Sequence, residues 1–167
     1  MKKIEIGTVV NGRELEVAVK PNQTLLEFLR DELHLKGSME GCGVGVCGSC
    51  TVLVEGRPVS SCLMLATNIE GKQVTTIEGL AVGDQLDPVQ QAFLEHQAFQ
   101  CGYCTPGMIM ATKALLMSNP RPTEEEARDY LSGNICRCGT YVEVLAAVKS
   151  LAEKTNTPAP SLATSRK

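Results

Sequence analysis

The chain has 167 residues, 43% of them hydrophobic and 21% charged, which is the composition of one or two globular domains and excludes fibrous and disordered classes. Its formal charge of -3 comes from 16 basic and 19 acidic residues, and neither half is basic, so we expect no nucleic-acid partner. No apolar run approaches the roughly 18 residues of a membrane span, and Glu5 interrupts the position of a signal peptide, so we expect a cytoplasmic protein without a membrane partner.

Residues 1–80 are predicted to form a small mixed domain, with one helix against a sheet. Asn11-Gly12 lies between two alternating segments and is a strong signal for a type I′ hairpin turn. Thr24 and Glu27 have the spacing of a capping box, and apolar residues at helical spacing follow them. The strand segments are expected over 3–6 and 14–19, over 51–59 as a hairpin turning near 55–56, and over 74–77.

Residues 78–85 contain two glycines and no clear period, so we interpret them as a linker, and a second domain is expected over 81–155. Beyond the linker the strand signals end, and helix-start signals occur at Asp87-Pro88, at Thr105-Pro106, and as capping boxes at Thr123 and Thr140. Short connections between helices favour an antiparallel four-helix bundle. The helices are predicted over 87–98, 105–118, 123–132 and 140–153, followed by a polar tail over 156–167.

Eight cysteines are the unusual feature of the composition. Without an export signal we expect a reducing compartment, where disulfides do not persist, so the thiols are better explained as metal ligands. They fall into two groups of four, which are Cys42, Cys47, Cys50 and Cys62, and then Cys101, Cys104, Cys136 and Cys138.

The first group has the spacing Cys42-x4-Cys47-x2-Cys50 with a distant Cys62, which is typical of a plant-type [2Fe–2S] site. Four of the ten residues over 41–50 are glycine, and glycine lets a tight loop wrap a cluster and aim amide hydrogens at sulfur. The alternative is a structural zinc site, although zinc sites usually take two similar cysteine pairs. The spacing favours the iron–sulfur interpretation.

The second group, Cys101-x2-Cys104 with Cys136-x-Cys138, leaves three interpretations open. Two short pairs fit a zinc knuckle, and the first pair alone has the form of a thioredoxin-like redox motif. A redox motif should follow a strand, whereas a predicted helix precedes Cys101. The third interpretation is a second [2Fe–2S] cluster between two helix N-termini, whose dipoles favour an anionic group.

Four segments together resemble the iron–sulfur subunit of molybdenum hydroxylases, the xanthine dehydrogenase and aldehyde oxidoreductase family. They are GCGVGVCGSCTV over 41–52, SC over 61–62, QCGYCTPGM over 100–108 and GNICRCGTY over 133–141. The resemblance covers roughly residues 1–155. One departure is Ser49, where relatives often have alanine.

The resemblance implies an α+β fold, in which a β-grasp plant-type ferredoxin-like domain precedes an all-α four-helix [2Fe–2S]-binding domain. The first cysteine group would hold an outer cluster near flavin, and the second would hold an inner cluster near a molybdenum pterin. The residue matching Gln100 contacts the pterin in relatives, and the ligand matching Cys138 lies against it.

The implied function is electron transfer, from a molybdenum cofactor on a large subunit through two [2Fe–2S] clusters to FAD on a medium subunit. The chain itself would contain no catalytic residue, and it would belong to a hetero-oligomer such as a dimer of heterotrimers. Relatives act on purines, N-heteroaromatics, aldehydes or carbon monoxide. The alternatives are a free-standing ferredoxin-like carrier or a zinc-stabilised interaction module, which iron content and copurifying chains distinguish.

Overall fold

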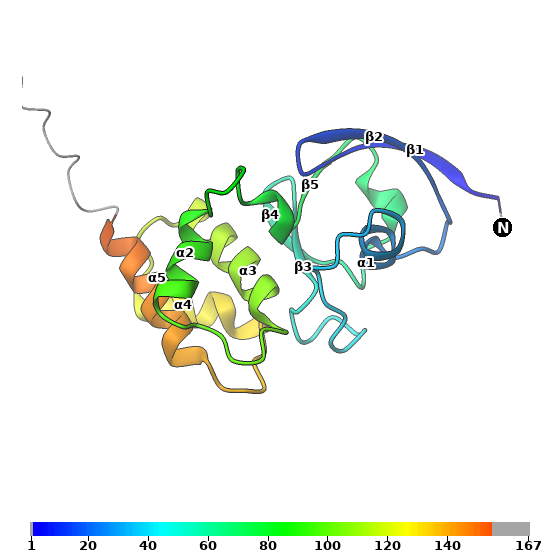
Figure 1. The fold of residues 1–167 in the computed structure, drawn as a ribbon. Coiled ribbons are helices and arrows are strands. Elements are labelled where there is room, and N and C mark those ends of the chain that lie inside the picture. Colours follow the sequence, from blue (N-terminus) through cyan, green and yellow to red (C-terminus); the bar gives the residue numbers. More distant parts are fainter. Residues whose placement is uncertain (1, 155–167) are drawn as a thin grey trace, which may run out of the picture.

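A computed structural model describes residues 2–154 and has a strand-rich first half and a helical second half (Figure 1). Its five strands form one sheet in the order β2-β1-β5-β3-β4. The parallel pair is β1 and β5, and the other neighbours are antiparallel, so the sheet is mixed. The strands are β1 (Ile4–Val10), β2 (Arg13–Val19), β3 (Thr51–Val54), β4 (Arg57–Ser60) and β5 (Gln73–Thr75). The predicted tail over 156–167 lies outside the described residues.

Both hairpins turn through two residues with positive φ. Asn11 and Gly12 have φ of 51° and 77°, and Glu55 and Gly56 have φ of 51° and 72°. Two successive positive φ values define the type I′ turn, whose twist matches that of the flanking strands. The structure therefore confirms both predicted turns.

Helix α1 (Leu25–Glu27) is short and continues as one π-helical turn, Phe28–Glu32. The predicted capping box is present, because the Glu27 N–H donates to Thr24 Oγ1 at 3.1 Å and the Thr24 N–H donates to Glu27 Oε2 at 2.8 Å. Leu25 and Phe28 are buried in the core of the first half, together with strand residues. This packing of the helical segment on the sheet confirms the predicted mixed domain.

Four helices build the second half: α2 (Pro88–Glu95), α3 (Thr105–Ser118), α4 (Glu124–Tyr130) and α5 (Tyr141–Lys154). They share one apolar core, to which α2 contributes Phe93 and α3 contributes Met108. The structure confirms the predicted four helices, although the N-cap of α3 is Cys104 and not Thr105. Within residues 2–154, no helix combines the length and the hydropathy that crossing a membrane requires.

Most element boundaries differ from the prediction by a few residues, and the first strand covers Ile4–Val10 and not 3–6. Two of the other differences have a physical cause in the structure. The last strand covers 73–75 and not 74–77, because Ile77 begins a 3-10 turn and packs against the helical core. Helix α2 ends at Glu95 and not at 98, because Gln97 has a φ of 51°, which an α-helix does not accommodate. The strand therefore ends two residues earlier than predicted, and Ile77 packs in the core of the second half.

The two halves meet where α3 packs against β3. Leu53 of β3 is buried against Met110 and Ala114 of α3, with Ile77 packed beside them. Gly107, at the start of α3, lies so close to the first half that a Cβ there would be 2.2 Å from the Gly48 carbonyl oxygen. The start of α3 is thus pressed directly onto the cysteine loop over 41–50.

Replacing Thr112 with valine is expected to stabilise the protein by about 1 kcal/mol, because it removes an unsatisfied buried hydroxyl at nearly constant volume. Thr112 Oγ1 is buried in α3 without a hydrogen-bond partner among the described residues. Denaturant unfolding measures the change. Thr112→Ser is the matched control, since it keeps the hydroxyl and loses a buried methyl, and it should be destabilising. A Thr112→Val protein no more stable than wild type would show that the hydroxyl has an internal partner.

Candidate metal centres

The first four cysteines gather at one end of the β3–β4 hairpin. Cys50 directly precedes β3 and Cys62 follows β4, so the hairpin brings these two residues together. Ser61 fixes their spacing, because its N–H and its hydroxyl both donate to the Cys50 carbonyl oxygen, at 3.4 and 2.7 Å. Cys42 and Cys47 are delivered by the glycine-rich loop that leads into β3.

That loop depends on glycine at specific positions. Gly45 has a φ of 76°, and a Cβ there would lie 2.3 Å from Leu63 Cδ1. Gly41 has no unusual φ, but its Cβ would lie 2.8 Å from Cys47 Sγ. Side chains at these glycine positions would therefore occupy the space inside the loop. Their absence leaves the backbone close to the sulfur atoms.

The electrostatics divide the first group into two pairs. The Val44 N–H, 3.5 Å from Cys42 Sγ, and the Cys47 thiol together lower the pKa of Cys42 to about 6. Burial and the neighbouring Cys50 thiol together raise the pKa of Cys62 to about 11. Hydrogen bonds between thiols thus join Cys42 to Cys47 and Cys62 to Cys50, and the charge of Cys42 also acts on Cys62.

The second group stands at the starts of two helices. Cys101 and Cys104 precede α3, and Cys136 and Cys138 precede α5. Cys136 is buried and Cys104 is half-buried, whereas Cys101 and Cys138 are exposed. The predicted placement of this group between helix N-termini is therefore what the structure shows.

These thiols also form two pairs. Burial and the adjacent Cys136 thiol together raise the pKa of Cys104 to about 12. Burial also raises the pKa of Cys136, but hydrogen bonds from Thr140 outweigh it and lower the value to about 7. The Tyr103 N–H lowers the pKa of Cys101, and so does the Cys138 thiol. Cys104 thus lies with Cys136, and Cys101 with Cys138.

A pairwise arrangement of four thiols fits a [2Fe–2S] cluster, in which four cysteines bind two irons. A structural zinc ion instead requires four ligands around a single point. The donor set and the glycine-rich loop both fit the two-iron group.

Hydrogen bonds connect the two ligand loops directly. The Ile135 N–H donates to the Cys47 carbonyl oxygen at 2.9 Å, and Asn134 Nδ2 donates to the Gly48 carbonyl oxygen at 3.0 Å. Tyr103 adds a third bond, from its hydroxyl to the Glu40 carbonyl oxygen at 2.7 Å. These contacts were not predicted from the sequence, although Asn134 and Ile135 lie inside the motif over 133–141.

Two motif residues have hydrogen bonds that were not predicted. Gln100 is exposed, and its Nε2 donates to the Cys138 carbonyl oxygen at 3.3 Å. The amide thereby joins the loop before α3 to the loop before α5. Thr140, predicted as the capping residue of α5, has its hydroxyl 3.2 Å from Cys136 Sγ.

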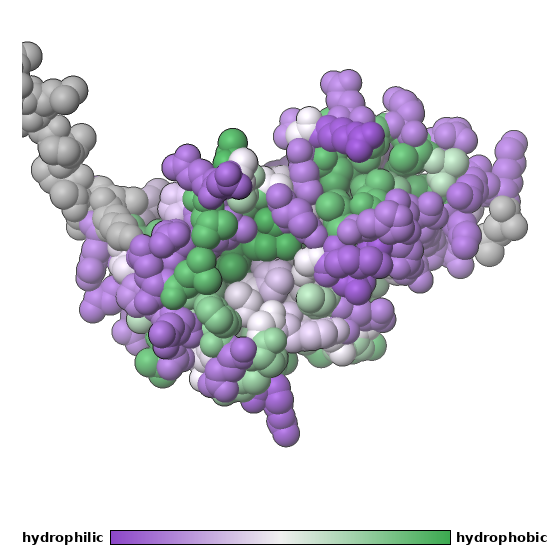
Figure 2. All heavy atoms as spheres, viewed as in Figure 1, coloured by the Kyte–Doolittle hydropathy of each residue, from purple (hydrophilic) through white to green (hydrophobic). Residues whose placement is uncertain are grey.

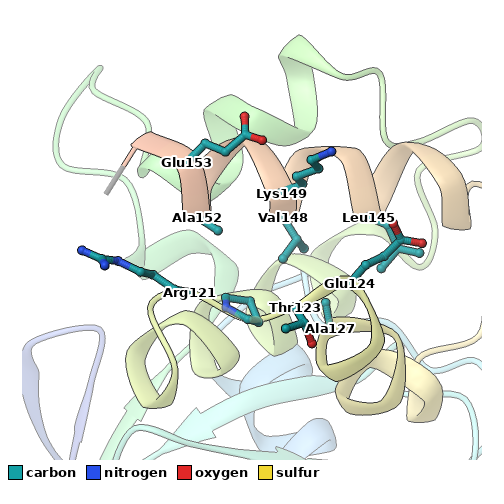
Figure 3. Close-up of a pocket in the computed structure, with 10 residues that line it drawn as sticks. Arg121, Thr123, Glu124, Ala127, Leu145, Val148, Lys149, Ala152 and Glu153 are labelled. Atoms are coloured by element: carbon teal, nitrogen blue, oxygen red, sulfur yellow. The ribbon is translucent and has the colours of Figure 1, made fainter. Parts of the chain in front are cut away.

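A separate hollow of about 330 Å³ lies between α4 and α5 (Figure 3). Figure 3 shows Arg121, Lys149 and Glu153 among the residues around it, so its rim carries both signs of charge. No cysteine lines this hollow. The hollow is therefore separate from both sets of thiols.

Two family models match the chain: a 2Fe-2S iron-sulfur cluster binding domain over residues 8–81 and a [2Fe-2S] binding domain over 76–149. The fold and the paired thiols thus define a two-domain iron–sulfur protein. The chain belongs to the small iron–sulfur subunits of the molybdenum hydroxylase family, and its homologues are subunits of oxidoreductases. This confirms the resemblance stated from the sequence.

Two of the relatives are similar over nearly their whole length. The small FeS subunit of nicotinate dehydrogenase from Eubacterium barkeri is 46% identical, over 92% of this chain and 98% of the relative. A chain of quinoline 2-oxidoreductase from Pseudomonas putida 86 superimposes with a TM-score of 0.88 and 39% identity, covering 93% of this chain and 98% of that one. Aldehyde oxidoreductase from Desulfovibrio gigas has a TM-score of 0.88 and 37% identity, but only 18% of that chain is covered.

Proposed function

We propose that this chain conducts electrons from a molybdenum cofactor on a large subunit to FAD on a medium subunit. One [2Fe–2S] cluster is bound by Cys42, Cys47, Cys50 and Cys62, and the other by Cys101, Cys104, Cys136 and Cys138. The clusters, when bound, supply one-electron redox chemistry. The proposed domains are 1–80 and 81–155. The observation that carries this proposal is the presence of two paired sets of four thiols in loops that contact each other.

The role of this chain's backbone is to hold the two sites close together. Cys47 belongs to the first set, and its carbonyl oxygen accepts the Ile135 N–H at 2.9 Å. Ile135 directly precedes Cys136, a member of the second set. One hydrogen bond and a few covalent bonds therefore join a ligand of one site to a ligand of the other.

The inner site suits contact with the large subunit. Cys101 and Cys138 are exposed, and beside them an apolar groove of about 360 Å³ is lined by residues that include Leu94 and Phe99. Figure 2 shows hydrophobic residues gathered over α2 and the loop that precedes it. A partner that covers this groove would also cover the two exposed thiols. Gln100 lies on the same side, which supports its proposed contact with the pterin.

The outer site has its own apolar surface, which we assign to the medium subunit. Val44, Val46 and Leu63 are exposed by 64%, 61% and 61%; the two valines lie between Cys42 and Cys47, and Leu63 lies beside Gly45 of the same loop. An exposed apolar cluster at one place on a protein marks an interaction site. Each set of thiols thus has a separate surface through which a partner can approach.

The purified complex is expected to contain about four irons on this chain and two distinct [2Fe–2S] signals, because each site binds two irons in a different environment. Iron and sulfide analysis, with EPR spectra recorded during graded reduction, measures both. Zinc in place of iron, or two irons with one signal at all potentials, would contradict the proposal. Purification without two larger chains would favour a free-standing carrier.

A further inference from the structure

We propose that the hydroxyl of Thr140 raises the reduction potential of the inner site by donating a hydrogen bond to the sulfur of Cys136. This inference rests on the proposed function, since it assigns Cys136 to an iron–sulfur cluster. Thr140 would act on the cluster through the Cys136 sulfur and would not itself bind iron.

The contact is short and shielded from water. Thr140 Oγ1 lies 3.2 Å from Cys136 Sγ, and the two residues are only 2% and 6% exposed. A cysteine that binds iron has lost its proton, so the hydroxyl must be the donor in the loaded protein. A hydrogen bond to an anionic sulfur is stronger in a site of low dielectric constant, and it favours the reduced state, which carries more negative charge.

Backbone N–H groups of Thr140 and Gly139 also point at this sulfur, and the hydroxyl adds a side-chain donor to them. The Cys136 N–H donates to Tyr141 Oη at 2.8 Å, so it is not aimed at a sulfur. The Thr140 carbonyl oxygen accepts the Val144 N–H at 3.1 Å, which fixes the residue at the start of α5. The hydroxyl is thus held in place by the first turn of a helix.

The outer site has a weaker counterpart, which gives a matched comparison. Ser49 Oγ lies 3.6 Å from Cys47 Sγ, and Ser49 is 5% exposed. A longer hydrogen bond contributes less. The potential of the outer site should therefore depend less on its hydroxyl than that of the inner site.

The test is a redox titration of the assembled complex, followed by EPR at the two separate signals. Thr140→Val should change the ratio of reduced to oxidised inner sites by about tenfold at a fixed potential, in favour of the oxidised form. That change corresponds to a lowering of about 59 mV for a one-electron couple. Thr140→Ser should restore the potential, and neither variant should move the outer signal. Ser49→Ala should shift the outer signal alone, and by less.

An inner potential that is unchanged in a fully loaded Thr140→Val protein would overturn the inference, as would an equal shift at both sites. If Thr140→Val does not load iron at the inner site, Thr140→Ala removes the same hydroxyl with less bulk. Spectra of the wild-type and Thr140→Val complexes in H₂O and D₂O provide an independent measurement, because only the wild type has an exchangeable hydroxyl proton beside this sulfur in addition to the backbone amides. If Thr140→Val lost no exchangeable coupling at the inner signal, that result would also overturn the inference. Wild-type iron content and the presence of two signals test the proposed function separately.

Discussion

A Gly107→Ala variant is expected to have a free energy of unfolding about 3 kcal/mol lower than wild type, because an extra methyl group in a tightly packed interface forces the backbone to move. It is also expected to lose iron from the outer site. The added Cβ would meet the Gly48 carbonyl oxygen at 2.2 Å and Ser49 Cα at 3.1 Å. Both are backbone atoms, so no side-chain rotation relieves the contact. Either α3 moves away from the first half or the loop over 41–50 changes shape. Denaturant unfolding and iron analysis measure the two effects.

Gly133→Ala is the matched control, because it adds the same methyl group in the neighbouring ligand segment. A Cβ at Gly133 meets nothing within 4 Å, and the residue has no positive φ. Its stability should stay within about 0.5 kcal/mol of wild type, as for most surface substitutions. If Gly107→Ala matched this control in stability and in iron content, the close approach of α3 to the loop would not constrain the outer site.

The second large effect is expected from removing one ligand at each site. Cys104→Ser should block electron entry, so that substrate reduces neither site of the complex. Cys47→Ser should leave the inner site reducible by substrate and stop reduction of the flavin. The reason is that each substitution disables a different four-thiol set, and only the second set lies beside the groove that includes Leu94 and Phe99. Stopped-flow absorbance of the assembled complex separates the two steps.

Iron analysis provides the control for these variants, since each should retain about two irons at its untouched site. A variant that lost all four irons would have a folding defect, and its kinetics would not measure electron transfer. In that case Thr140→Val serves as a milder change at the inner site. If Cys104→Ser and Cys47→Ser stopped the reaction at the same step, the proposed serial order would be wrong.

Local signals in the sequence predicted most of the secondary structure. Asn11-Gly12 and the capping boxes at Thr24 and Thr123 act within a few residues, so they could be recognised without the rest of the fold. The end of α2 had no such signal. Gln97 has a positive φ there. A Gly or Asn at this position would have predicted such a helix end, whereas Gln does not.

Non-local contacts could not be predicted in the same way. Ile77 continues a regular strand pattern in the sequence, but its side chain packs against the core of the helical half. The cysteine spacings identified both four-thiol sets, yet nothing in them indicated that Asn134 and Ile135 would bond to the Gly48 and Cys47 carbonyl groups. Such pairings depend on the packing of two halves whose relative position follows from many apolar contacts.

The bond from Asn134 to Gly48 has a consequence for the synthesis of the chain. Its two residues are 86 positions apart, so the glycine-rich loop leaves the ribosome long before its partner does. Protein domains generally form in order from the N-terminus during translation. The strand-rich half can therefore fold first, while its cysteine loop still lacks the hydrogen bonds that brace it. That loop acquires its final support only when the segment before α5 has been made, which ties completion of the outer site to a residue 86 positions further along the chain.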